Sequence, residues 1–158
     1  MNSYLIYSAG RLALVEPGSG DYLLPTAGKL QQNLKAAGVN PADIDTVILT
    51  HMHPDHSAGL TNPKTGEKFF PNAELVVHEN EPKHWRDDAL MNQAPERAKL
   101  LYFQAAREQM APYHNQMKPY TGSVEVFPGV QSMPMHGHTP GHSGYMVSMV
   151  FMNLSRQA

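Results

Sequence analysis

The chain has 158 residues, of which 41% are hydrophobic and 16% are charged. This composition is typical of a folded globular protein and excludes a disordered chain. Twelve basic and 14 acidic residues leave a net charge of -2, too little to attract a polyanion or a membrane surface, so we expect neither nucleic acid nor a membrane as a partner. Since the chain contains no cysteine, any metal must bind to nitrogen and oxygen atoms.

The length suits one domain, which we expect to span residues 1–158. The first residues lack the basic and long apolar segments of a signal peptide, and no stretch of the chain reaches membrane-spanning length. The sequence therefore predicts a single-domain cytoplasmic protein.

The first half of the chain alternates between strands and a helix. Residues 4–7 and 11–15 are short apolar runs that predict a β-hairpin. Residues 28–37 predict a helix, since apolar residues recur at helical spacing and Gly38 follows as a stop signal. A short turn at 41–44 precedes the run 46–50, which is β-branched and apolar throughout, the pattern of a strand buried on both faces.

The second half continues the alternation, and together the two halves favour layered α/β architecture. Further strands are predicted at 75–78, 124–127, 130–135 and 145–151, and a helix at 95–110.

Three of the nine histidines lie between positions 51 and 56, directly after the predicted buried strand 46–50. Ligands of α/β proteins bind beyond the carboxyl ends of strands, so chemistry is expected there. His51 and His53 are separated by one residue and point the same way in extended backbone, which lets both bind one ion. Pro54 turns the chain and allows Asp55 and His56 to face them. A solvated histidine-rich loop is the alternative, but it lacks a preceding strand and a following glycine.

The segment Thr50-His51-Met52-His53-Pro54-Asp55-His56-Ser57-Ala58-Gly59 resembles the THxHxDHxxG signature of the metallo-β-lactamase superfamily. Gly137-His138-Thr139-Pro140-Gly141-His142-Ser143 is similar to the second signature of the same superfamily. The region from Tyr4 to Val147 most closely resembles the branch that contains methyl parathion hydrolase and the acyl-homoserine lactonases.

The resemblance implies an αβ/βα sandwich with a dinuclear metal centre. It implies that His51, His53 and His138 hold the first metal, zinc by preference, and that Asp55 and His56 serve the second. His142 is similar to a residue that lies just behind the metal ligands, and Glu16 stands where the family usually has an aspartate. Manganese, iron or cobalt would also fit imidazole and carboxylate ligands.

The resemblance ends before the family's last metal ligands. Members usually carry an aspartate that bridges both metals and a final histidine, whereas this chain has no acidic residue after Glu125 and no histidine after His142. We therefore expect an incomplete version of the sandwich that lacks much of the second half, with one complete metal site and one incomplete site. A homodimer, in which a second copy covers the open face, is the expected assembly.

The implied activity is hydrolysis of a small-molecule ester, lactone or phosphotriester by a zinc-bound hydroxide. Asp55 is the expected catalytic residue, which orients the attacking water or takes its proton. Two alternatives stay open: a catalytically impaired zinc-binding remnant of such a hydrolase, and a nuclease of the same superfamily, which the absence of a basic patch disfavours. Trp85 and His84 could line a substrate pocket or could pack a helix onto the sheet.

Overall fold

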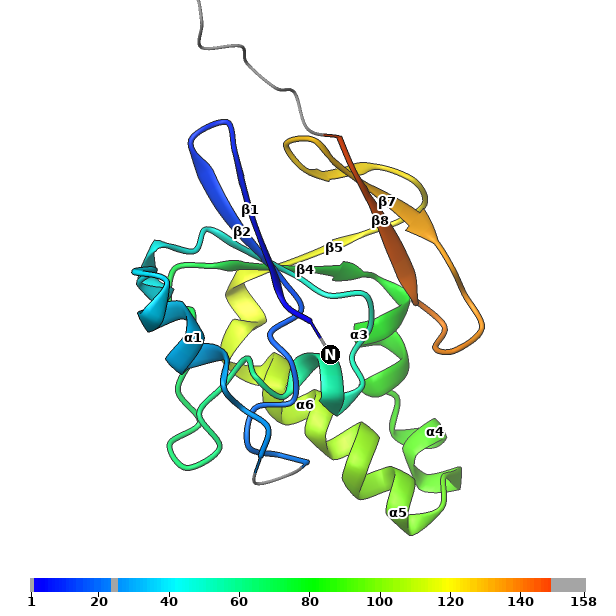
Figure 1. Ribbon diagram of the computed structural model, residues 1–158. Coiled ribbons are helices and arrows are strands. Elements are labelled where there is room, and N and C mark those ends of the chain that lie inside the picture. Colours follow the sequence, from blue (N-terminus) through cyan, green and yellow to red (C-terminus); the bar gives the residue numbers. More distant parts are fainter. Residues whose placement is uncertain (1, 24–25, 149–158) are drawn as a thin grey trace, which may run out of the picture.

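The computed structural model describes residues 2–23 and 26–148, and its main feature is a five-stranded sheet (Figure 1). Its strands lie in the order β1 (Tyr4–Ser8), β2 (Arg11–Val15), β3 (Thr46–Ile48), β4 (Glu74–His78) and β5 (Met117–Tyr120). The pair β1–β2 is the predicted antiparallel hairpin, and β2 to β5 run parallel to one another.

Helices connect these strands and cover one face of the sheet (Figure 1). In chain order they are α1 (Leu30–Ala36), the 3-10 helix η1 (Pro41–Asp43), α2 (Pro54–Ser57), α3 (Asn80–Trp85), α4 (Asp88–Gln93), α5 (Glu96–Ala98), the π-helix η2 (Lys99–Gln104), α6 (Ala105–Met110) and the 3-10 helix η3 (Ala111–Gln116). None of the helices in the described part of the chain combines the length and apolar character needed to cross a bilayer.

A second sheet of three antiparallel strands covers the other face. Its strands are β6 (Glu125–Phe127), β7 (Val130–Pro134) and β8 (Ser143–Val147), in that order. Figure 1 shows β7 and β8 on the side of the main sheet that faces away from most of the helices. The described residues therefore form three layers: helices, a five-stranded sheet and a three-stranded sheet.

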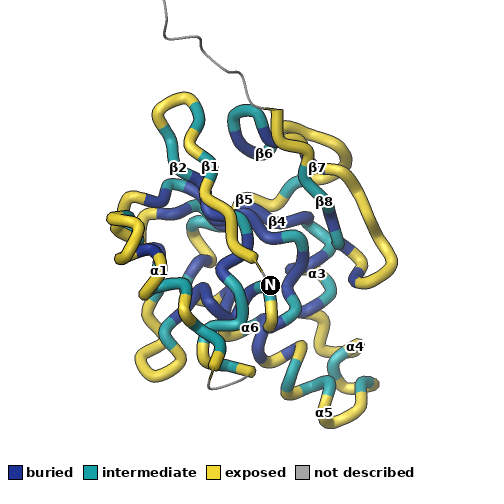
Figure 2. The backbone as a smooth tube through the Cα atoms, viewed as in Figure 1, coloured by how far each residue is buried: buried dark blue, intermediate teal, exposed yellow. Residues whose placement is uncertain are grey.

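Alternation of side chains along β3 explains why both faces of the main sheet are covered. Val47 and Leu49 belong to the core cluster on the helical side, together with Met110 and Tyr113. Ile48 points the other way and packs with residues of the second sheet, such as Phe127. Successive side chains of a strand point to opposite faces, and all three residues of β3 are buried, so both faces of the strand are covered. In Figure 2 the middle strands of the main sheet are drawn largely in the dark blue of buried residues.

The predicted α/β class is confirmed, with corrections to individual elements. The predicted helix 95–110 is a chain of α5, η2 and α6 rather than one α-helix. Sequence patterns missed α3 and α4, which are only one to two turns long, and β5, whose Lys118 and Pro119 obscure the strand pattern. The last predicted strand begins earlier, at Ser143, and residues 149–151 of that prediction lie outside the described residues.

The parallel arrangement of β2, β3 and β4 brings three chain segments to one edge of the sheet. Glu16 directly follows β2, the histidine segment follows β3 within a few residues, and Glu81 lies just after β4. Because parallel strands end on the same side, these polar residues meet although they are far apart in the sequence.

Candidate metal centre

The segment that follows β3 presents two imidazole rings on the same side of the backbone. His53 has extended backbone angles (φ -63°, ψ 149°) and caps α2, while the Met52 side chain between the two histidines is fully buried in the core. The rings of His51 and His53 consequently lie with their centroids 4.7 Å apart. Burial of Met52 thus fixes the side on which both rings emerge.

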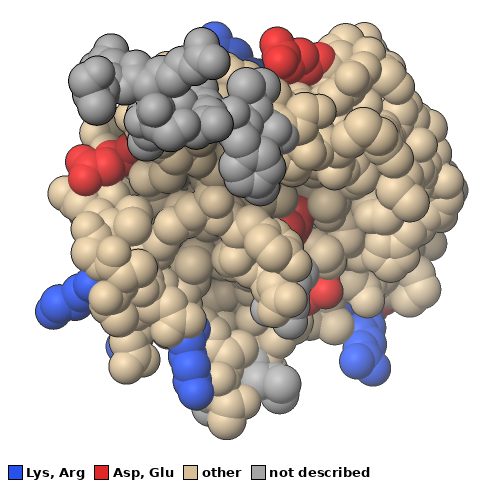
Figure 3. All heavy atoms as spheres, turned by 45° about the horizontal axis from the view of Figure 1, so that its top comes forward, with Lys and Arg blue, Asp and Glu red and all other residues tan. Residues whose placement is uncertain are grey.

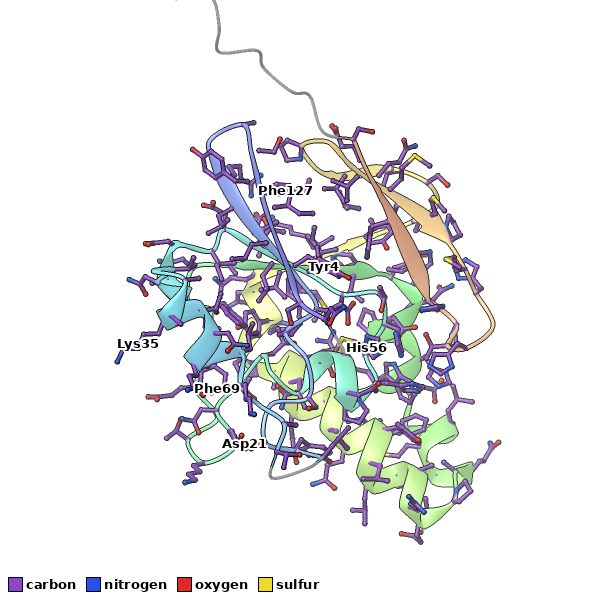
Figure 4. The ribbon with its side chains drawn as sticks, in the orientation of Figure 1. Tyr4, Asp21, Lys35, His56, Phe69 and Phe127 are labelled. Carbon is purple, nitrogen blue, oxygen red and sulfur yellow. The ribbon has the colours of Figure 1, made fainter. Side chains whose placement is uncertain are left out.

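The short helix α2 turns the chain back toward His51. The carbonyl of His53 accepts hydrogen bonds from the backbone N–H groups of His56 and Ser57, both at 2.9 Å. This single turn brings the His56 ring to a centroid distance of 4.0 Å from His51, and His56 Nε2 to 3.3 Å from Asp55 Oδ2. Figure 4 labels His56, which lies between the strands and the helical layer.

His138 arrives from the β7–β8 connection, 85 residues after His53 in the sequence. His138 Nε2 lies 3.0 Å from His53 Nδ1, and the His138 ring centroid lies 4.8 Å from that of His51. Two nitrogen ligands of a tetrahedral zinc ion at about 2.0–2.1 Å are separated by about 3.3 Å. The spacing of His53 and His138 is therefore close to what one zinc ion requires.

The potential ligand atoms form two groups that share His51. One group comprises His51, His53 and His138 and the other His51, Asp55 and His56, with ligand atoms within 4.8 Å of one another in each group. The structure thus brings together all five residues that the sequence nominated as metal ligands. It also places the ring of His142 beside them, 5.0 Å from that of His51.

The His51 ring provides a test of whether these residues suit a metal. Its Nε2 atom is buried and has no hydrogen-bond partner among the described residues, whereas Nδ1 lies 3.0 Å from Thr50 Oγ1. With its proton on Nδ1, the ring directs an unused lone pair into the cluster. A buried polar atom without a partner is costly, and a divalent metal would satisfy it.

Burial keeps two of the rings in the neutral form that binds metals. Burial and, secondarily, the neighbouring histidines lower the pKa of His51 to about 2. Burial and the adjacent His138 lower the pKa of His53 to about 4, although the negative charges of Asp55 and Glu81 oppose this. At neutral pH neither ring has to lose a proton before it coordinates a metal.

Glu16 has the opposite effect on His56, because it raises the pKa of this ring. One of its oxygens, Oε1, accepts the Thr50 N–H at 2.6 Å, and the other, Oε2, contacts His56 Nδ1. Burial by itself would lower the pKa of His56, but the hydrogen bond and charge of Glu16 raise it above its ordinary value. Glu16 has a left-handed backbone (φ 63°), which is uncommon for a non-glycine residue and points to a functional constraint.

Gly59, the glycine of the signature, lies where two loops touch. Its N–H donates to the Gly18 carbonyl at 2.8 Å, and Gly18 N–H in turn donates to the His56 carbonyl at 3.1 Å. A Cβ atom at position 59 would lie only 2.2 Å from the Pro17 carbonyl oxygen. Glycine is required here for close approach of the backbones.

Aromatic rings form one wall beside the cluster. The rings of Trp85 and Tyr102 lie with centroids 5.5 Å and 4.7 Å from that of His53. Tyr102 belongs to the π-helix η2, and π-helical turns frequently occur at functional sites. The sequence singled out Trp85 but missed Tyr102, because the hydrophobic pattern does not reveal a π-helical turn. His84 packs against Trp85 and Phe103 rather than against the histidine cluster.

Comparison with known proteins identifies the family. The profile of the metallo-beta-lactamase superfamily matches residues 2–153. The chain therefore belongs to this superfamily, and the resemblance inferred from the two signatures is confirmed.

Three similar proteins are named as lactonases or as a hydrolase. An N-acyl homoserine lactonase of Bacillus cereus is 28% identical over 116 residues, which make up 72% of this chain and 37% of that protein. The crystal structure of the hydrolase AbOPH superposes with a TM-score of 0.83 at 30% identity, over 93% of this chain and 51% of that one. The dizinc quorum-quenching lactonase AidC shares the fold (TM-score 0.81, 24% identity, over 93% and 52%). The chain spans about half the length of these structures and just over a third of the curated relative.

The pKa values of the cluster make the stability of the metal-free protein depend on pH. Below pH 6.5 histidines of the unfolded chain bind protons, whereas folded His51 and His53 do not until about pH 2 and 4. The unfolded state then binds more protons, so the unfolding free energy falls with falling pH, by at most about 1.4 kcal/mol per pH unit for each ring. His56 has a raised pKa, so its protonation stabilises the folded state. This stabilisation is present below pH 6.5 and is lost as the pH rises above 6.5.

Urea unfolding of chelator-treated protein should therefore show lower stability at pH 5.5 than at pH 6.5. In unfolded chains Asp and Glu side chains have pKa values of about 4, below this window. A His53→Gln variant should have a smaller pH dependence and serves as the control. Equal stability of the parent protein at the two pH values would contradict the low pKa values.

Glu16→Gln should lower the pKa of His56, because the amide keeps the shape of the side chain but removes the charge that raises this pKa. The titration of the His56 ring, followed by NMR in metal-free protein, measures the effect. Glu67→Gln, at an exposed carboxylate bonded by Thr65, is the matched control. An unchanged His56 titration in Glu16→Gln would refute the role of Glu16.

Proposed function

We propose that this chain is a metal-dependent hydrolase that binds zinc through His51, His53 and His138 and acts on an ester or lactone. The observation that carries the proposal is the buried, unpartnered Nε2 of His51 at the point where His53 and His138 converge. Membership of the superfamily and relatives named N-acyl homoserine lactonase support hydrolysis of a small molecule, with a lactone as the preferred substrate and a phosphotriester as the next candidate.

Zinc, when bound, would lower the pKa of a water molecule toward 7 and polarise the oxygen of the substrate. The side chains supply the rest of the chemistry. Asp55 is half exposed, with 52% of its side chain accessible, and its carboxylate lies within 3.3 Å of His56 Nε2 at the rim of the cluster. From there it can orient the attacking water and accept its proton. Tyr102 and Trp85 provide an apolar wall for the part of the substrate that does not react.

A second metal should bind more weakly than the first. The second group shares His51 with the first and adds only Asp55 and His56 as ligands of its own. Since a lone pair of His51 can serve one ion at a time, filling the first group reduces what the second can offer.

Groups that surround metal ligands often change activity tenfold or more, so a chain that lacks some of them can bind zinc without catalysis. Such a chain is the main alternative. A nuclease is less favoured. On the face shown in Figure 3, the lysine and arginine side chains lie apart from one another, so this face has no basic patch for phosphate backbones. Association of two copies stays a prediction.

Elemental analysis of purified protein should find about one strongly held zinc ion per chain. His138→Ala should lose this ion, since it removes one of three ligands, whereas His114→Ala, outside both groups, should retain it. A zinc content that is the same in His138→Ala as in the parent protein would refute the assignment of His138.

Asp55→Asn should lower kcat by about 10²-fold or more while the affinity for the first zinc stays within a few-fold, because the amide cannot accept a proton. Turnover should be measured on an aryl ester, a lactone and a phosphotriester, with zinc content determined on the same samples. Zinc binding without turnover of any of the three substrates by the parent protein would favour the non-catalytic alternative. Equal activity of Asp55→Asn would contradict the role of Asp55.

A further inference from the structure

Glu81 is a buried carboxylate that no motif of the sequence singled out. It lies in the first turn of α3, directly beyond the carboxyl end of β4, and its side chain is fully buried (0% exposed). Burying a carboxylate is costly unless hydrogen bonds replace its lost water. Among the described residues no lysine or arginine forms a salt bridge with Glu81, so neutral donors must do this.

Each oxygen of Glu81 accepts two hydrogen bonds. Oε2 accepts the backbone N–H of Met52 at 2.9 Å and the indole N–H of Trp85 at 2.8 Å. Oε1 accepts the backbone N–H of Gly141 at 2.8 Å and the hydroxyl of Thr139. Four donors and no acceptor match the acceptor-only character of a carboxylate.

The four donors connect the two loops that carry the candidate zinc ligands. Met52 lies between His51 and His53, and Thr139 directly follows His138. The Trp85 ring, held by the same carboxylate, packs against the His53 ring at a centroid distance of 5.5 Å. Glu81 therefore holds the backbone beside His53 with one oxygen and, with the other, the Thr139 hydroxyl and the Gly141 N–H of the loop that carries His138.

Packing around Gly141 shows how closely the second loop approaches Glu81. A Cβ atom at position 141 would lie 2.8 Å from Glu81 Cγ and 2.9 Å from its backbone nitrogen. Only glycine allows this approach, so the second loop rests directly on α3. Asn80 adds a further link through its Nδ2, which donates to the Pro140 carbonyl at 3.2 Å.

We infer that Glu81 is a positioning residue that sets the spacing between the His53 and His138 rings and so determines the zinc affinity of the site. The inference rests on the proposed zinc binding. The negative charge of Glu81 also acts on the His53 ring, where it favours a divalent cation.

Two variants of the full chain test the inference. Glu81→Gln keeps the shape of the side chain but turns an NH₂ group toward two donors, which breaks the link to one of the loops. Thr139→Val is milder, since it removes only the hydroxyl that donates to Glu81 Oε1. Its matched control is Thr61→Val, which removes another buried hydroxyl bonded to a buried side chain, Gln109, outside the cluster.

Zinc affinity is measured by competition with a chromophoric chelator, and melting temperatures are recorded with and without zinc. We expect zinc binding to weaken about 10- to 100-fold in Glu81→Gln and about tenfold in Thr139→Val, while Thr61→Val binds zinc as the parent does. The stabilisation by zinc should shrink in parallel. Glu81→Asp, which restores the charge, should recover part of the affinity.

A purely structural role predicts a different result. If Thr139→Val lowers the melting temperature of the metal-free protein as Thr61→Val does, yet binds zinc with parental affinity, the inference is wrong. This holds even if Glu81→Gln fails to fold, because Thr139→Val preserves the carboxylate. If the parent chain binds no zinc, the proposed function fails and the inference with it, whereas parental zinc affinity in Thr139→Val overturns the inference alone.

Discussion

The site depends on the parallel pairing of β2, β3 and β4. This pairing aligns the carboxyl ends of the strands at one edge of the sheet, so that Glu16, His51 and Glu81 meet there. The central strand is buried on both faces, by helices on one side and the second sheet on the other. A buried strand cannot shift its register without exposing its apolar side chains, and the position of His51 is therefore fixed by the core.

Imidazole rings form most of the candidate centre, and buried carboxylates support them from behind. The inner residues are largely imidazoles, and burial keeps His51 and His53 neutral at physiological pH. Carboxylates lie behind them: Glu16 against His56, and Glu81 beneath both ligand loops. His51 and His53 can therefore bind a divalent cation without first releasing protons, and the outer carboxylates hold the rings in orientation.

Much of this arrangement could be predicted from the sequence, because the information is local. The run 46–50 defines a buried strand, and the spacing of His51, His53 and His56 follows from extended backbone and one helical turn. Glu81 could not be predicted, because a single glutamate in a short helix has the pattern of a surface residue. Tyr102 was missed for a related reason, since its approach to His53 depends on a π-helical turn that sequence periodicity does not encode.

Gly59 allows the loop after β2 to lie directly against the loop that follows α2. Its backbone touches Pro17, the residue next to Glu16, and Gly18 bonds to the carbonyl of His56. Any side chain at position 59 would act as a wedge that pushes the loop after β2 away from α2. The carboxylate of Glu16 would then withdraw from His56, so the absence of a side chain at position 59 helps to set the orientation of the His56 ring.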